Sequence, residues 1–245
     1  MRTFRGYTLS FLLASFASFV LDMIYFNEQH RCVLCGRTLY REHQKEDNLI
    51  LLDKICLFCQ LKLLQVDILP ARRSLVVQGS QVPVFAAFPY HGFLPEVIRS
   101  WKYDGALGLT DWLVSPLLPF IERQLPCSFD MIVPVPTTNQ RITARGYQQT
   151  EVLAYALSKK IRRPVVSLLS KQSIQAESQT GKNKAERMDA IQHAIQVVFP
   201  ERLQKRRLLL VDDVVTTGST MAACAKELLN VGAQSVMGVA IAYVP

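Results

Sequence analysis

Apolar residues beyond residue 81 follow two spacings, one typical of buried strands and one typical of amphipathic helices. Strands are predicted where apolar residues run together, at 82–88, 131–135, 165–169, 208–211 and 235–242. Helices are predicted where apolar residues recur three or four positions apart, at 94–103, 148–160 and 219–230. A mostly apolar helical segment at 106–125 is broken by Pro116 and Pro119. This alternation predicts an α/β fold with a doubly wound parallel sheet flanked by helices.

The first 29 residues have a pattern of their own. An apolar stretch at 7–21 follows Arg2 and Arg5, as in a signal peptide, but no small-residue cleavage site follows it. A membrane-spanning helix needs about 20 apolar residues, so no stable membrane span is predicted. Two interpretations remain open: an amphipathic or interfacial helix, or a start assigned upstream of a true start at Met23.

Changes in composition divide the chain into four parts. The N-terminal extension at 1–29 is followed by a cysteine-containing unit at 30–64. Residues 65–81 are poorly periodic and hold a proline and two adjacent arginines, so they are predicted to form a linker. The α/β domain is predicted at 82–245.

Four of the six cysteines form two pairs, Cys32 with Cys35 and Cys56 with Cys59. Each pair has the CxxC spacing of a metal-binding knuckle, and the distance between the pairs is typical of a four-thiolate zinc ribbon. Four thiolates complete the tetrahedral shell of Zn²⁺, so the predicted zinc is structural. A redox CxxC motif is the alternative, which two pairs at this spacing disfavour.

Basic residues exceed acidic residues and concentrate in the middle of the α/β domain. The formal net charge is +8, and residues 131–210 hold 14 Lys and Arg against five Asp and Glu. The densest run is Lys159, Lys160, Arg162 and Arg163. Such an excess favours phosphates, nucleic acid or an acidic membrane surface as partners, although a solvated surface explains it equally well. With 49% hydrophobic and 20% charged residues, the composition excludes wholesale disorder.

The segment 208–220, LLLVDDVVTTGST, combines a strand, an acid pair, a hydroxyl-rich turn with one glycine, and the start of a helix. Backbone N–H groups of the turn and the positive amino end of the helix can bind a phosphate. The acid pair can accept hydrogen bonds from two ribose hydroxyls and assist a hydrated Mg²⁺. A plain strand end with a helix cap is the alternative, which the full set of positions disfavours. The predicted ribose-5-phosphate site consists of Asp212, Asp213, Thr216, Thr217, Gly218, Ser219 and Thr220.

This motif resembles the site for phosphoribosyl diphosphate (PRPP) in type I phosphoribosyltransferases. Two further blocks, PVP at 134–136 and RGYQQ at 145–149, together with the paired cysteines, resemble the ComF/GntX family. The resemblance extends over about residues 30–242. Gln148 stands where that family more usually has Asn. The implied fold is a type I phosphoribosyltransferase-like domain preceded by a small zinc ribbon.

The resemblance also implies ligands, partners and a role in natural competence. PRPP would bind with Mg²⁺, and the stretch at 136–145 would hold its diphosphate, with Arg141 and Arg145 as anion clamps. Two solvated surface arginines are the alternative. The protein would handle incoming single-stranded DNA beside a ComFA-like DNA translocase. Candidates for base stacking are the aromatic residues Tyr90, Phe93, Trp101, Tyr103 and Tyr147, of which Trp101 has the helical spacing of a core residue.

Two other functions remain open on the sequence alone. One is a phosphoribosyltransferase that acts on a base or amine, and the other is a PRPP-sensing regulator without turnover. The sequence contains no recognisable base-binding hood or general base, so no catalytic residue is assigned. Thiol pairs and a sugar-phosphate ligand predict a cytoplasmic location. The apolar N-terminal stretch adds a peripheral position at the membrane as an alternative.

Overall fold

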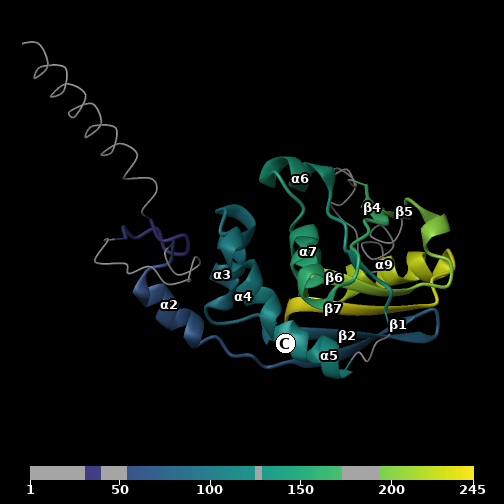
Figure 1. Cartoon of the computed structure of the whole chain (residues 1–245), viewed down its shortest axis with the longest axis horizontal. Helices are drawn as coiled ribbons and strands as arrows, with labels where there is room; N and C mark the ends of the chain where they lie inside the picture. The colour runs from purple at the N-terminus through teal and green to yellow at the C-terminus, as the bar shows by residue number, and fades with distance from the viewer. Residues whose placement is uncertain (1–30, 40–53, 125–128, 173–193) are drawn as a thin grey trace, which may run out of the picture.

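The computed structural model describes residues 31–39, 54–124, 129–172 and 194–245. The strands of its main sheet are β1 (Ala71–Val77), β2 (Ser80–Pro89), β3 (Met131–Pro134), β6 (Arg207–Val215) and β7 (Ser235–Tyr243). They lie in the order β1-β2-β7-β6-β3 (Figure 1). Strands β2, β7, β6 and β3 run parallel, and β1 pairs antiparallel with β2 at one edge. The predicted α/β fold with a mostly parallel sheet is confirmed.

Helices cover both faces of this sheet. Helix α7 (Gln149–Ile161) packs against β3 and β6, and α9 (Ser219–Asn230) packs against β6 and β7. Alternate residues of β6 belong to different cores: Leu209 lies in the core that contains α7, and Leu208 and Leu210 lie in the core that contains α9. Because both faces are buried, the strand is apolar at successive positions, as its sequence predicted.

Short helices complete the core on the α7 face. They are α3 (Leu94–Tyr103), α4 (Thr110–Val114) and α5 (Leu118–Gln124), separated by the 3₁₀ turns η2 (Leu107–Leu109) and η3 (Ser115–Leu117). Trp101 of α3 is fully buried, and its Nε1 donates a hydrogen bond of 3.0 Å to Thr110 Oγ1. The remaining elements are α2 (Leu57–Leu64), α6 (Asn139–Arg145), β4 (Leu169–Lys171), β5 (Ile195–Val197) and η5 (Pro200–Arg202). Strands β4 and β5 form a separate two-stranded sheet.

The predicted linker at 65–81 is wrong for residues 71–81, which form β1, a tight turn and the start of β2. Gln78 and Gly79 have φ values of 50° and 79°, the signs that a two-residue type I′ hairpin turn requires. The side chains from Ala71 to Val76 alternate between half-buried and exposed positions, because one face of this edge strand is open to solvent. The two adjacent arginines on this partly exposed strand are the reason why its sequence resembles that of a polar linker.

Two other strand predictions change in extent. Strand β6 continues past the predicted end at Val211 as far as Val215, because its pairing with β7 continues. The acid pair consequently lies inside a strand and not in the turn that follows it. The predicted strand at 165–169 is displaced, since Val165 forms an isolated bridge and β4 begins only at Leu169.

Some predicted features lie outside the described residues. The main one is the N-terminal extension at 1–29. Within the four described ranges, no helix has the length and apolar character needed to cross a membrane.

Candidate ligand pocket and cysteine cluster

A cavity of about 450 Å³ lies at the carboxyl ends of β3 and β6. Ligands of open α/β sheets bind at this edge, because the loops that follow parallel strands converge there. The cavity wall combines the end of α3, the stretch from β3 to the start of α7, the end of β4 and the acid pair of β6. Its charged residues are Lys102, Arg141, Arg145, Lys171, Asp212 and Asp213. We call the four basic ones the pocket cations.

A smaller hollow at the start of α9 is formed by the predicted phosphate loop. Asp212 and Thr220 border both this hollow and the large cavity. Gly218 has a φ of 77°, a conformation that favours glycine, and a Cβ atom there would lie 2.6 Å from Leu75 Cδ2, so the leucine side chain would have to shift. The first turn of α9 borders the hollow, and unpaired N–H groups at such a turn attract anions.

Arg73 of β1 fixes the position of this loop. Its Nη1 donates a hydrogen bond of 2.8 Å to the carbonyl oxygen of Thr216, and its Nη2 donates to the carbonyl oxygen of Val244. Thr217 is the predicted loop residue that borders neither hollow; its Oγ1 lies 3.1 Å from Ser219 Oγ, in a hydrogen bond that shapes the turn. The hairpin that replaces the predicted linker therefore supports the loop.

The acid pair is held by the backbone and by one lysine. Asp212 Oδ1 accepts a hydrogen bond of 2.8 Å from the N–H of Asp213, and Asp213 Oδ1 accepts one of 2.6 Å from the N–H of Val214. Asp213 Oδ2 lies 2.5 Å from Lys102 Nζ, and both side chains are 18% exposed. Burial, together with the neighbouring charge of Asp213, raises the pKa of Asp212 to about 7. Asp213 is thus a paired carboxylate, whereas Asp212 can exchange a proton near neutral pH.

Arg141 and Arg145, the predicted anion clamps, border the large cavity from a helix. The stretch at 136–145 is helical from Asn139 onward, as α6, and Gly146 ends this helix with a φ of 80°. The stretch expected to hold the diphosphate is therefore mainly helical.

The surroundings of Arg145 place a further polar group in the cavity wall. Its Nη1 donates a hydrogen bond of 2.7 Å to Gln149 Oε1, and its guanidinium carbon lies 4.4 Å from the centre of the Tyr103 ring. Gln149 is buried, and among the described residues its Nε2 has no hydrogen-bond partner. A buried, unpaired donor beside several cations suits an anionic ligand.

Several residues that line the pocket or support its phosphate loop were not predicted from the sequence. Lys102 lies in the last turn of a helix with the spacing of a core element, and no local signal connects it with Asp213. Arg73 lies in the segment expected to be a linker. Gln149 belongs to the RGYQQ block, so a signal for it was present, although its burial and unpaired amide follow only from the fold. Lys171 lies at the end of a strand that the sequence placed too early.

The dense basic run lies away from this pocket. Lys159, Lys160, Arg162 and Arg163, which we call the α7-end cluster, are all exposed at the carboxyl end of α7. Helix α7 has 13 residues and is therefore about 20 Å long, with Gln149 at its other end. Lys160 Nζ lies 3.4 Å from Asp111 Oδ1. The cluster is a separate surface and does not contribute to the cavity.

Arg207, the first residue of β6, has a structural role. Its Nη2 lies 2.9 Å from an oxygen of Asp130, and its backbone N–H donates to the other oxygen at 2.8 Å. Hydrogen bonds from the side chain and then the backbone of Arg207 lower the pKa of Asp130 to about 2. This pair joins the amino ends of β3 and β6.

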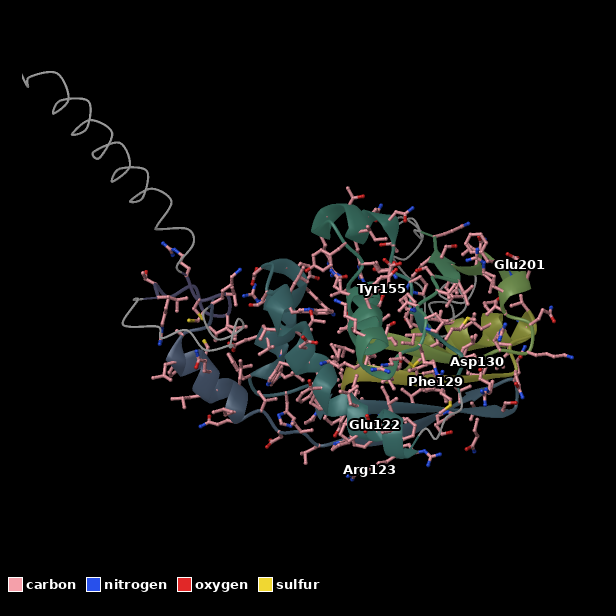
Figure 2. All side chains as sticks on the ribbon, in the orientation of Figure 1. Glu122, Arg123, Phe129, Asp130, Tyr155 and Glu201 are labelled. Atoms are coloured by element: carbon pink, nitrogen blue, oxygen red, sulfur yellow. The ribbon has the colours of Figure 1, made fainter. Side chains whose placement is uncertain are left out.

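The predicted stacking residues differ in accessibility. Trp101 is in the core, and the Tyr147 hydroxyl donates a hydrogen bond of 2.8 Å to its carbonyl oxygen. Tyr90 and Phe93 are half-buried against the same core. Tyr103 is 62% exposed beside the pocket, which makes it the aromatic residue of this set best placed to meet a base. Tyr155 on α7 is similarly exposed, at 55%, and has no place in the cavity wall (Figure 2).

The four paired cysteines converge in the N-terminal unit. Their Sγ atoms all lie within 4.8 Å of one another, and those of Cys35 and Cys56 are 3.6 Å apart. Tetrahedral zinc with Zn–S bonds of about 2.3 Å separates its sulfur ligands by about 3.8 Å, so the cluster has a suitable size. Burial raises the pKa of the Cys32 thiol, but backbone hydrogen bonds, first from Cys56, outweigh it and lower the value to about 7. The cluster can hold a metal ion.

Comparison with known proteins connects these features with one family. The phosphoribosyl transferase domain family matches residues 141–245. Competence protein ComFC of Bacillus subtilis is 23% identical over 203 residues, which cover 83% of this chain and 73% of that protein. Competence protein F of Haemophilus influenzae is 32% identical over 108 residues, and DNA utilization protein YhgH of Escherichia coli is 34% identical over 113 residues. These two matches cover 44% and 46% of this chain and 47% and 48% of the relatives, about half of each.

The matched domain begins within α6 and contains α7 and the acid pair, whereas Lys102 and the cysteine cluster precede it. The competence-protein relatives extend the similarity over most of the chain. The chain is therefore similar to ComF competence proteins, and its residues 141–245 match the phosphoribosyl transferase domain family.

Proposed function

We propose that this protein binds PRPP in the two adjoining hollows and handles single-stranded DNA in natural competence. PRPP carries a phosphate on C5′ and a diphosphate on C1′ of one ribose, so it requires two anion sites with hydroxyl acceptors between them. The observation that carries the proposal is Asp212, which borders both hollows. One hollow is formed by a helix amino end, and the other is lined by the pocket cations.

Each part of PRPP then has a matching group. The 5′-phosphate would bind the loop from Thr216 to Thr220, and the ribose hydroxyls would donate to the acid pair. The diphosphate would bind Arg141 and Arg145. One of its oxygens would also accept a hydrogen bond from Gln149 Nε2, a buried donor that has no partner among the described residues. Four cations face two acids in this cavity, and one of the acids has a pKa near neutrality.

The pocket also fits Mg²⁺ that arrives with the diphosphate. Mg²⁺ keeps several waters and binds through one or two carboxylates together with substrate phosphates. Asp212 and Asp213 would hold it through those waters, and it would neutralise diphosphate charge. Because Lys102 already pairs with Asp213, Asp212 is the more available of the two carboxylates.

Binding of single-stranded DNA is supported by exposed groups and by the relatives. Tyr103 presents its ring beside Arg145 at the cavity, and the α7-end cluster offers four cations for phosphate contacts. The relatives are named for competence and DNA utilization. We therefore place the protein in the cytoplasm or at its membrane boundary, beside a ComFA-like translocase that delivers the strand.

The second candidate function is that of a catalytically active phosphoribosyltransferase, which transfers the phosphoribosyl group of PRPP to a base or amine. It is favoured by Asp212, since a carboxylate with a pKa near 7 can take a proton from an attacking base or amine. A regulator that senses PRPP without turnover is the third.

One assay separates these functions. PRPP binding and diphosphate release are measured side by side, with and without single-stranded DNA. Binding without release, together with DNA binding, supports the proposal, and release with a free base supports the transferase. Binding of PRPP without any affinity for DNA supports the sensor. Absence of PRPP binding in all conditions contradicts all three.

We further propose that the cysteine cluster holds one structural zinc. Cys59 is buried, and Cys59→Ser should remove the metal and lower solubility, because metal binding contributes to the folding of so small a unit. Cys224→Ala, at a buried thiol outside the cluster, is the control and should retain the metal. Freshly purified, reduced wild type without zinc would contradict the proposal.

A further inference from the structure

Helix α2 carries an apolar face that the rest of the described chain leaves exposed. Leu57, Leu61 and Leu64 are 70%, 52% and 82% exposed and lie on one side of the helix, at positions i, i+4 and i+7. The opposite side is buried and contributes Cys59 to the metal cluster and Leu63 to the core. The helix lies at the periphery of the molecule, away from the main sheet (Figure 1).

The exposed face continues beyond the helix. After the helix, Ile68 and Leu69 are each 54% exposed. Within the helix, Phe58 is 47% exposed. Of the thirteen large apolar side chains exposed in the described ranges, six lie between Leu57 and Leu69. Exposed apolar residues are ordinary when scattered, but a concentration of this kind indicates a surface that something covers. We call these six residues the α2 patch.

Cations surround the α2 patch. The Arg37 guanidinium carbon and Lys62 Nζ lie 4.6 and 4.9 Å from the centre of the Phe58 ring, and Lys54 is exposed just before the helix. Asp67 is the single acidic residue in the described stretches 31–39 and 54–70. Long basic side chains can cover apolar surface while their charges reach outward, so this rim complements a negatively charged surface.

We propose that the α2 patch is a docking surface for an anionic phospholipid membrane. An eight-residue helix is about 12 Å long, too short to span a bilayer but long enough to lie in its interface with leucines in the acyl region. The basic rim would meet the lipid phosphates, each cation adding to the attraction. The cysteine cluster fixes the orientation of the helix.

The sequence offers a second contact of the same kind. The apolar stretch at 7–21, with Arg2 and Arg5 before it, precedes the unit that contains α2. A single shallow apolar anchor binds membranes weakly and reversibly, and two anchors together give stable association. The α2 patch would therefore act as one of two weak anchors. This inference does not require PRPP or DNA to bind.

The test uses the full zinc-loaded chain and vesicles, without PRPP or DNA. Co-sedimentation is measured with phosphatidylcholine vesicles and with equimolar phosphatidylcholine and phosphatidylglycerol vesicles, at low and high salt. Wild type should bind the anionic vesicles, and high salt should weaken the binding. Leu61→Glu combined with Leu64→Glu should lower the partition coefficient about tenfold, since it places two charges in the apolar contact.

Val76→Glu is the matched control, because Val76 is 74% exposed on β1, outside the α2 patch. It should bind vesicles like wild type, and all variants should keep their zinc content. Two results would overturn the inference: no binding of wild type to anionic vesicles, or equal binding of wild type and the double variant. A wild-type dimer that becomes a monomer in the double variant, by light scattering, would assign the α2 patch to a second copy instead. Unchanged PRPP affinity in the double variant separates this outcome from the proposed function.

Discussion

Basic residues lie next to both ends of helix α7, but their surroundings differ. At the amino end, Arg145 converges with the other pocket cations, two carboxylates and a buried amide around one cavity. At the carboxyl end, the α7-end cluster extends into solvent, where the helix dipole alone favours cations and one ion pair with Asp111 spans 3.4 Å. The comparison teaches that a ligand site is recognised by converging groups and not by the density of charge along the chain.

The largest difference is expected between two variants, one with substitutions among the pocket cations and one with substitutions in the α7-end cluster. Arg141→Gln combined with Arg145→Gln should weaken PRPP binding about 100-fold, because two charge-assisted hydrogen bonds are lost. The four residues of the α7-end cluster changed to Gln should leave PRPP affinity within about twofold, since no ligand group reaches them. Titration calorimetry measures both. Equal losses in the two variants would remove the distinction between the ends.

A second test asks which exposed aromatic residue meets DNA bases. Tyr103→Ala should weaken binding of a labelled single-stranded oligonucleotide about tenfold, as expected when one stacking platform is lost. Tyr155→Ala is the control, because this tyrosine is similarly exposed on α7 outside the pocket. Fluorescence anisotropy gives both affinities. If the two variants behave alike, the pocket end has no special role in DNA contact.

Substitution of the α7-end cluster is expected to have a smaller effect on the affinity for single-stranded DNA. If four to six phosphates are neutralised, log affinity should fall against log salt with a slope of roughly −3 to −4 for single strands. Changing the four residues to Gln should make this slope less steep and reduce affinity a few-fold. Anisotropy titrations at several salt concentrations measure it. A flat dependence in wild type contradicts electrostatic DNA binding, and an unchanged quadruple variant moves the contact to the pocket cations.

Titration of the pocket acid should appear in the stability of the ligand-free protein. The pKa of Asp212 is raised to about 7, so the folded state holds a proton that the unfolded state has released. The free energy of unfolding should therefore fall between about pH 4 and pH 7, by on the order of 1–3 kcal/mol. Asp212→Asn should abolish this fall. Urea unfolding at a series of pH values measures it, and an equal fall in the variant would contradict the raised pKa.

Asp130 gives the opposite sign and serves as a control. Its pKa is lowered to about 2, so its ion pair with Arg207 stabilises the fold above about pH 4 and is lost as the pH falls toward 2. Asp130→Asn should remove only the fall in the free energy of unfolding below about pH 4. The fall in the free energy of unfolding between pH 4 and pH 7 should remain.

The parts of the site that could be predicted from the sequence are those encoded locally. The loop from Thr216 to Gly218 and the start of α9 follow one another in the chain, and the predicted helix at 219–230 has the observed bounds. The cysteine pairs are likewise recognisable from spacing, since each knuckle is contained in four residues. Local patterns determine such elements because their hydrogen bonds form between near neighbours.

The parts that could not be predicted depend on contacts between distant segments. Lys102 reaches Asp213 only because α3 packs beside the carboxyl edge of the sheet. Arg73 ties the phosphate loop to β1 only because a Gln78-Gly79 turn folds the expected linker into a hairpin. Such contacts follow from strand order, which hydrophobic spacing does not specify.

The central claim is that the acid pair and its two hollows form a PRPP site. Calorimetric titration of PRPP into wild type and into the Asp212→Ala, Asp213→Ala double variant tests it most directly. We expect saturable binding with one site in wild type and loss of binding in the variant, with an unchanged circular dichroism spectrum, because both side chains line the ligand cavity. Equal PRPP affinity in the two proteins would contradict it.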